Sequence, residues 1–264
     1  MGSLDLESVR AQIRVEGPLT FPGAIGASWT LFQLHALRLL KVFAPILLSL
    51  YVVAWGLFEL APIPEPASSQ RADDAPAALF VGAFLNIIIG TCLSSVLVGI
   101  GAARIAAAGR QDLERTLPPM RDLVAAGLVV AMVPVALVLS GPLIVALPLL
   151  LRVLLGPPVV AHQIVFERQT LGEAFRSARS LLAGNWGRVF LWLLVVALVL
   201  NLASTASFSA ANRLLSELLQ SSALARFLLG LVAGAVEAIL LVWLTAVSLV
   251  VYVDLRTRAG VAAE

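Results

Sequence analysis

Two charged residues inside apolar stretches are the side chains most able to do chemistry. Arg152 lies in the run LPLLLRVLLGPPVVAHQIVF at 147–166, and Glu237 lies in GLVAGAVEAILL, which begins at Gly230. A cation at the centre of a bilayer costs about 2.5 to 3.5 kcal/mol on insertion scales, so it should face protein and meet an acceptor or water. We therefore expect Arg152 to meet Glu237 or freed backbone carbonyls inside a helical bundle.

A helix break follows Arg152 at Gly156, Pro157 and Pro158. The two prolines supply no backbone N–H, and Pro157 also restricts the residue before it, so the helix should kink or break and free carbonyls for the arginine. Broken helices also form the binding sites of transporters. We favour a structural role for the arginine, and a ligand or ion site is the alternative.

The motifs of the common enzyme classes are absent from the sequence. It contains no Walker-type Gly-Lys loop, no G-x-S-x-G, no CxxC and no HExxH, so nucleotide hydrolysis, serine hydrolysis and zinc catalysis lack their usual groups. His162 has no neighbouring ligands, whereas a metal site usually needs three or four. We expect no catalytic activity, no metal and no cofactor.

Composition predicts a membrane protein. Apolar residues make up 60% of the 264 residues and charged residues 13%, and the mean hydropathy is +0.97, whereas a soluble domain is about half apolar and about a quarter charged. The basic residues are scattered arginines without a polybasic run, so nothing indicates nucleic acid as a partner. The single cysteine, Cys92, excludes an intramolecular disulfide.

The apolar segments must position these residues. A helix needs about 20 mostly apolar residues to cross the hydrocarbon of a membrane. The sequence therefore predicts an all-α bundle of six transmembrane helices, at 42–61, 78–101, 122–140, 143–165, 188–207 and 226–252. The predicted organisation is an N-terminal cytoplasmic segment at 1–22, a transmembrane domain at 23–260 and a tail at 261–264.

The distribution of arginine sets the expected orientation. With the N-terminus placed in the cytoplasm, 14 of the 18 basic residues fall on the inside, against Arg71, Arg213 and Arg226 outside. Cytoplasmic loops carry such an excess of positive charge. We expect both termini in the cytoplasm.

Amphipathic helices are expected at the membrane surface before the first and fifth spans. Thr170 and Glu173 have the spacing of a capping box, and Gly184 suits the end of the helix. One face of this stretch is apolar, comprising Leu171, Ala174, Phe175, Ala178, Leu181 and Leu182. A comparable stripe precedes the first span, at Trp29, Phe32, Ala36, Leu39 and Phe43. These helices either seal the bundle, which we favour, or form a docking surface.

Small residues at helical spacing predict close helix packing. One ridge in the second span contains Gly82, Asn86, Gly90 and Ser94, and the sixth span carries Gly230 and Gly234 two turns and one turn before Glu237. Gly-x-x-x-Gly spacing lets helices approach closely, and an asparagine can hydrogen-bond across the contact. We favour packing over a pore lining.

A polar cluster is expected where the fourth and sixth spans reach the cytoplasm, with Glu167, Arg176, Arg179, Asp254, Arg256 and Arg258 as its members. Asp254 should pair within its own segment or with the arginine face of the helix that begins near Thr170. Binding of anionic lipid headgroups is a secondary role for these arginines.

The segment VVAHQIVFERQTLGEAFRSARSLLAGNW, followed after two spans by VYVDLRTRAG, resembles a known family. It is similar to the membrane domain found N-terminal to the catalytic barrel in some bacterial glycerophosphodiester phosphodiesterases, which also occurs alone in uncharacterised membrane proteins. Matching positions are Glu167, Glu173, Ala174, Leu181, Asn185, Trp186, Tyr252, Asp254, Leu255, Arg256 and Arg258. Ala178 replaces a usual serine and Ala259 a frequent acidic residue.

This resemblance covers about 21–260 and implies a six-helix fold in a bacterial cytoplasmic (inner) membrane. The resemblance does not imply phosphodiesterase activity, because that chemistry needs paired histidines and metal-binding carboxylates. His35 and His162 have no acidic cluster beside them. The leading hypothesis is a non-catalytic scaffold or accessory subunit of a larger membrane complex, with lipids and other membrane subunits as partners. The alternative is a transporter or channel-like protein for a lipid or small solute that uses Arg152 and Glu237. A polar cavity containing both residues would favour transport.

Overall fold

The computed structural model of the chain describes residues 6–13, 17–60, 93–107, 120–139, 159–219 and 223–261. Every regular element in these ranges is a helix. They are α1 (Leu6–Ile13), α2 (Phe21–Leu60), α5 (Met120–Leu139), α7 (Leu171–Leu182), α8 (Trp186–Leu219) and α9 (Ala223–Val261), with further helices at Leu93–Ala106 and 159–167. The predicted all-α class is confirmed for this part of the chain.

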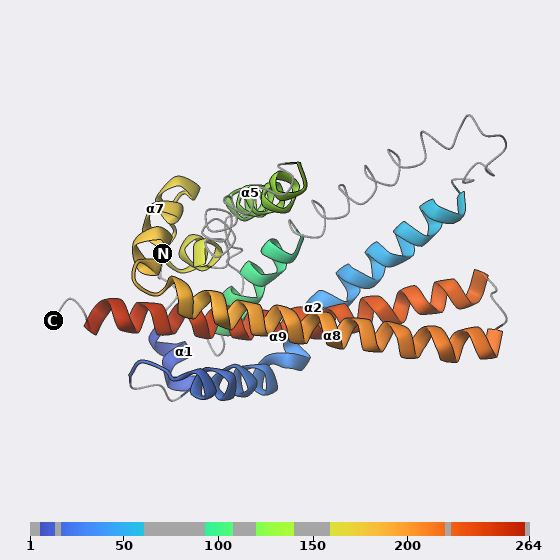
Figure 1. Cartoon of the computed structure of the whole chain (residues 1–264), viewed down its shortest axis with the longest axis horizontal. Helices are drawn as coiled ribbons and strands as arrows, with labels where there is room; N and C mark the ends of the chain where they lie inside the picture. Colours follow the sequence, from blue (N-terminus) through green and yellow to red (C-terminus); the bar gives the residue numbers. More distant parts are fainter. Residues whose placement is uncertain are drawn as a thin grey trace.

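The long helices α2, α8 and α9 form the frame of the molecule, with 40, 34 and 39 residues. α9 packs against both α2 and α8. Figure 1 shows α8 and α9 side by side along the longest axis, while α2 crosses them and diverges toward its C-terminal end. The remaining described helices gather around the C-terminal half of α9.

Two stretches in the described ranges are long and apolar enough to cross a membrane, Phe21–Val53 in α2 and Phe227–Gly260 in α9. Only 17% and 22% of their most apolar windows are buried inside the molecule. The prediction of six spans is not confirmed. The segments 78–101 and 143–165 lie only partly within the described residues, and α5, which contains most of 122–140, is seen nearly end-on in Figure 1 and so runs across α8 and α9.

The expected surface helix before the first span is not a separate element, because it continues into that span as α2. Pro45 lies inside α2 without ending it. A proline within a helix removes one backbone hydrogen bond and bends the axis, and Figure 1 shows α2 changing direction along its length. Leu39 and Phe43 of the predicted stripe are buried, whereas Trp29 is 52% exposed.

The amphipathic helix predicted to begin near Thr170 is present as α7, while its position at a membrane surface stays a prediction. Its N-terminus is capped by Glu173, whose Oε2 accepts hydrogen bonds from the Thr170 backbone N–H at 3.0 Å and from its hydroxyl at 2.7 Å. These bonds hold the pKa of Glu173 below its usual value because they stabilise the ionised carboxylate. Gly184 has φ +78° in the turn at 183–185 that leads into α8, a conformation that glycine adopts without strain.

The core lies around the C-terminal half of α9, where nearly every residue from Thr245 to Leu255 is buried. A helix that is apolar on all sides is surrounded by protein or by membrane, and this part of α9 is covered by other helices. Helix 93–106 supplies one of them at Gly101, where a Cβ would lie 2.8 Å from Thr245 Cγ2 and 3.0 Å from Phe43 Cζ. Helix 93–106, α2 and α9 are therefore in close contact at this point. This contact holds in place the C-terminal half of α9, which carries Asp254, Arg256 and Arg258.

Candidate functional site

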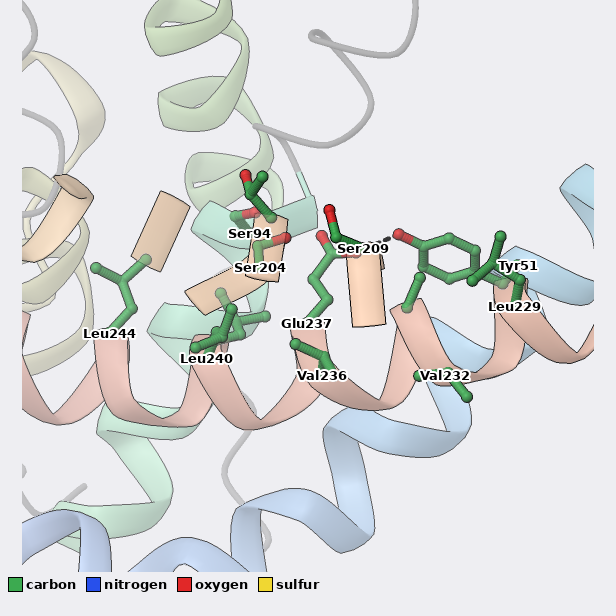
Figure 2. Close-up of a pocket in the computed structure, with 13 residues that line it drawn as sticks. Tyr51, Ser94, Ser204, Ser209, Leu229, Val232, Val236, Glu237, Leu240 and Leu244 are labelled. Carbon is green, nitrogen blue, oxygen red and sulfur yellow. Dashed lines mark hydrogen bonds between the residues drawn. The ribbon is translucent and has the colours of Figure 1, made fainter. Parts of the chain in front are cut away.

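A cavity of about 710 Å³ lies between α2, helix 93–106, α8 and α9, on the N-terminal part of α9. Figure 2 shows side chains from these helices converging on it. Its polar groups are the Glu237 carboxylate and the hydroxyls of Tyr51, Ser94, Ser204, Thr205 and Ser209. Leucine, valine and alanine side chains form the rest of the wall. This mixture of an apolar wall and a few convergent polar groups is typical of small-molecule sites.

Among the described residues that line this cavity, Glu237 is the only ionisable acid or base apart from the Tyr51 phenol. The Tyr51 hydroxyl donates a hydrogen bond of 2.7 Å to Glu237 Oε2. Gly234 permits this arrangement, because a Cβ at that position would lie 2.8 Å from Tyr51 Cδ2 and 3.3 Å from Leu48 Cδ2. The Tyr51 ring therefore packs against the backbone at Gly234. Its hydroxyl reaches Glu237, which lies about one turn further along α9.

The predicted partner of Glu237, Arg152, lies outside the described residues, and so do Gly156, Pro157, Pro158, Gly82, Asn86 and Gly90. The pairing of Arg152 with Glu237 stays a prediction, and the partner that the structure gives Glu237 is Tyr51. Ser94, expected in a packing ridge, lines the cavity. Gly230 and Gly234 both face Tyr51 across the contact between α9 and α2.

The groups around this cavity can hydrogen-bond a ligand and balance its charge. Among the described residues, its lining supplies one carboxylate and several hydroxyls, and no imidazole, thiol or amine. In the described part of the chain, no cluster of three or more His, Cys, Asp or Glu side chains could hold a metal ion. A carboxylate held in a largely apolar wall is suited to balancing a positive charge on a ligand.

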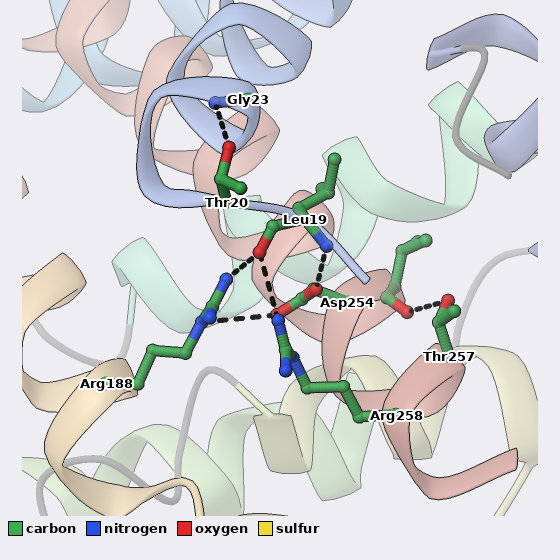
Figure 3. Close-up of polar contacts among 8 residues, drawn as sticks. Leu19, Thr20, Gly23, Arg188, Asp254, Thr257 and Arg258 are labelled. Carbon is green, nitrogen blue, oxygen red and sulfur yellow. Dashed lines mark hydrogen bonds and ion pairs between the residues drawn. The ribbon is translucent and has the colours of Figure 1, made fainter. Parts of the chain in front are cut away.

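A second polar cluster surrounds Asp254 near the C-terminal end of α9 (Figure 3). Its Oδ1 accepts a 2.7 Å hydrogen bond from the Leu19 backbone N–H, and its Oδ2 lies 3.0 Å from Arg258 Nε and 3.6 Å from Arg188 Nε. Both arginines also donate to the Leu19 carbonyl. The cluster therefore ties the chain entering α2 to the start of α8 and the end of α9.

Two further contacts complete this arginine-rich end. The Glu167 carboxylate accepts hydrogen bonds from the Tyr252 hydroxyl and from Arg256, with which it forms an ion pair. Arg10 of α1 donates a 2.9 Å hydrogen bond to the Thr257 hydroxyl. A residue near the start of the described chain thus lies beside one near its end.

Arg176 and Arg179, expected as alternative partners of Asp254, instead lie exposed on α7, where Arg176 Nε donates to the Gly172 carbonyl at 3.4 Å. Arg188 is the residue that pairs with Asp254, because the turn after α7 brings the start of α8 next to α9. Sequence reasoning missed Arg188 and also missed Tyr51. A lone tyrosine in the apolar run LLSLYVVAWG was the available signal, since a buried phenol usually finds a partner.

No family model, curated protein or solved structure matches this chain. The resemblance to the membrane domain of glycerophosphodiester phosphodiesterases therefore stays a prediction. The fold itself defines the class: an all-helical protein, in the described ranges, with two helices long and apolar enough to cross a membrane.

Proposed function

We propose that this protein is a non-catalytic multi-pass membrane protein that binds a small cationic solute in the cavity around Glu237, as a transporter or channel-like protein would. The observation that carries the proposal is the cavity of about 710 Å³, in which the described lining residues supply one carboxylate and five hydroxyls in an otherwise apolar wall. Sequence reasoning alone favoured an accessory role. We now prefer transport because Glu237 lines a cavity, although the second residue of that hypothesis, Arg152, lies outside the described residues.

A membrane location is part of the proposal. The apolar windows of α2 and α9 are mostly unburied, and so much exposed apolar surface is stable only in an apolar solvent or against a partner. The proposal also includes six spans, both termini in the cytoplasm and a location in a bacterial cytoplasmic membrane. The excess of arginine on one side supports this orientation, as does the contact between Arg10 and Thr257, which joins the two ends of the described chain.

The test compares a cation with its neutral analogue. Thermal unfolding of the purified protein in mild detergent is measured with benzylammonium and with benzyl alcohol. A ligand that binds only the folded state raises Tm as its concentration exceeds Kd, and we expect a rise with benzylammonium alone. Glu237→Gln should weaken that binding by roughly tenfold to a hundredfold, since one charge-assisted hydrogen bond is worth about 1.5 to 3 kcal/mol.

Asp122→Asn is the matched control, because it removes one carboxylate in the first turn of α5, away from the lining of the cavity. It should leave the effect of benzylammonium unchanged. Equal stabilisation by both compounds, or full stabilisation of the Glu237→Gln variant, would contradict the proposal.

A second candidate function is the accessory subunit of a membrane complex. The observation that favours it is an exposed apolar face on α8, formed by Leu191, Leu194, Leu198 and Leu202, which are 49% to 60% exposed. Such a face contacts either lipid or a partner helix. Purification from native membranes in mild detergent should then recover stoichiometric companions, and a lone monomer would count against this candidate.

A further inference from the structure

A second cavity, of about 200 Å³, lies between the N-terminal part of α2, α8 and α9. Aromatic rings form much of its wall, with Phe21, Trp192 and Trp243 among them. Apart from the two indoles, the only polar side chain among its described lining residues is Ser28, whose hydroxyl already donates a 2.7 Å hydrogen bond to the Ala24 carbonyl of its own helix. The cavity is therefore suited to an apolar chain.

The cavity opens at its rim, where Ile25 and Val199 are 48% and 45% exposed. Trp192, by contrast, is only 5% exposed. A slender group can therefore enter from the outer face of the molecule and reach the indole ring without displacing a helix.

One cationic side chain, Arg188, lies against the wall of this cavity, and a second lies next to it. The Arg188 guanidinium sits over the Trp192 ring, 5.0 Å from its centroid, and Arg258 shares with it the contacts to Asp254 and Leu19 shown in Figure 3. Among the described residues, two arginines face one carboxylate, so these three side chains carry a net positive charge. Their side chains are 32% and 26% exposed, and a guanidinium has five N–H donors, so both can bind a further anion.

The arginine cluster around Asp254 and the apolar cavity follow one another along α8. Arg188, Trp192 and Val199 are spaced by four and seven residues, and 11 residues of helix extend about 16 Å. A positive charge at the arginine-rich end is thus followed by the apolar cavity of about 200 Å³, which runs toward the middle of the long helices and is called the slot below. We propose that this slot holds an anionic phospholipid of the surrounding bilayer, with its phosphate against Arg188 and Arg258 and one acyl chain beside Trp192.

Tryptophan fluorescence provides the test, because brominated acyl chains quench indoles that they touch. The protein is placed in nanodiscs of phosphatidylglycerol and phosphatidylcholine at equal mole fraction, with bromine on one lipid or on the other. We expect stronger quenching by brominated phosphatidylglycerol. The excess should disappear in Trp192→Phe/Trp243→Phe, while Trp29, which is 52% exposed, remains quenched equally by both lipids.

The variants separate this site from general attraction to anionic lipid. Arg188→Gln/Arg258→Gln should lower the preference for phosphatidylglycerol by roughly fivefold for each arginine removed, the effect of about one cationic side chain at an anionic surface. Arg176→Gln/Arg179→Gln removes the same charge from the exposed face of α7 and should keep the preference.

Because Arg188 and Arg258 also hold Asp254, their double variant could lose its fold. Ser28→Leu avoids this difficulty, since it fills the slot and leaves every arginine in place, and it should abolish the excess quenching in protein that elutes as the wild type does. Equal quenching by the two lipids in the wild type, or undiminished excess in the Ser28→Leu variant, overturns the proposal.

Discussion

At the scale of single residues, Asp254 has the most demanding environment at the arginine-rich end. It is 2% exposed, and its two oxygens meet one backbone N–H and two guanidinium groups. A buried carboxylate is stable only when its charge is balanced and its lone pairs are hydrogen-bonded. Asp254 meets both conditions, and its partners come from three separate places in the chain, Leu19, Arg188 and Arg258.

Replacing Asp254 tests whether this cluster holds the three segments together. Asp254→Asn keeps the shape of the side chain but leaves two arginines without their counter-ion. We expect the free energy of unfolding to fall by about 2 to 3 kcal/mol, below the full cost of breaking a buried pair because both arginines reach solvent. Titration with a denaturing detergent from mixed micelles measures the change.

Asp122→Asn serves as the comparison, because Asp122 lies in the first turn of α5 and contributes mainly through the helix dipole, worth about 1 kcal/mol or less. If the two variants lost the same stability, the cluster around Asp254 would not join the segments as described.

At the scale of elements, the contact between α2 and α9 decides where the polar cavity forms. Gly234 lies beneath the Tyr51 ring, and the hydroxyl of that ring reaches Glu237. The absence of a side chain at Gly234 allows the two helix backbones to approach closely. Since Tyr51 is held at both its ring and its hydroxyl, it has little freedom to move away from an added Cβ.

Two alanine substitutions one turn apart test this contact. Gly234→Ala would place a Cβ 2.8 Å from Tyr51 Cδ2 and should cost about 1 to 3 kcal/mol through overpacking. Gly230→Ala is the matched control, because its Cβ would lie at an ordinary 3.9 Å from Tyr51 Cδ1, and alanine favours a helix by up to about 1 kcal/mol. Detergent-induced unfolding of both variants should therefore change in opposite directions. Equal stability of the two would show that α2 and α9 do not meet at Gly234.

At the scale of the whole molecule, the ion pairs gather at one end of the long helices, and apolar side chains are exposed along them. The ion pairs of Asp254 and Glu167 lie at the C-terminal end of α9, and the outward faces of α2, α8 and α9 expose leucine, isoleucine and valine. This division is typical of a protein whose charged end lies at a membrane surface.

The proposed topology predicts which positions share a side of the membrane. In a Cys92→Ser background, single cysteines are introduced by Ser69→Cys in the segment 61–77, by Arg179→Cys on α7 and by Ala262→Cys near the chain end. A maleimide that cannot cross membranes should label the last two from the cytoplasmic side and the first from the opposite side, as the positive-inside distribution requires. Labelling of all three from one side would contradict the six-span arrangement.

Local features of the fold were readable from the sequence. The Thr170 and Glu173 spacing predicted the start of α7, and the order of its apolar residues predicted its buried face, because helix capping and helical periodicity depend on residues three or four positions apart. Composition and apolar length predicted the helical class in the same way.

Partnerships across the chain depended on the tertiary structure. Apolar pattern predicted a boundary between a surface helix and the first span, but α2 continues past Pro45. Nothing in the sequence near Asp254 names Arg188 rather than Arg176, and nothing near Glu237 names Tyr51, 186 positions away. Periodicity specifies which face of a helix is buried, whereas the partner of a charge on that face depends on how helices cross, and the crossing depends on side chains from the whole bundle.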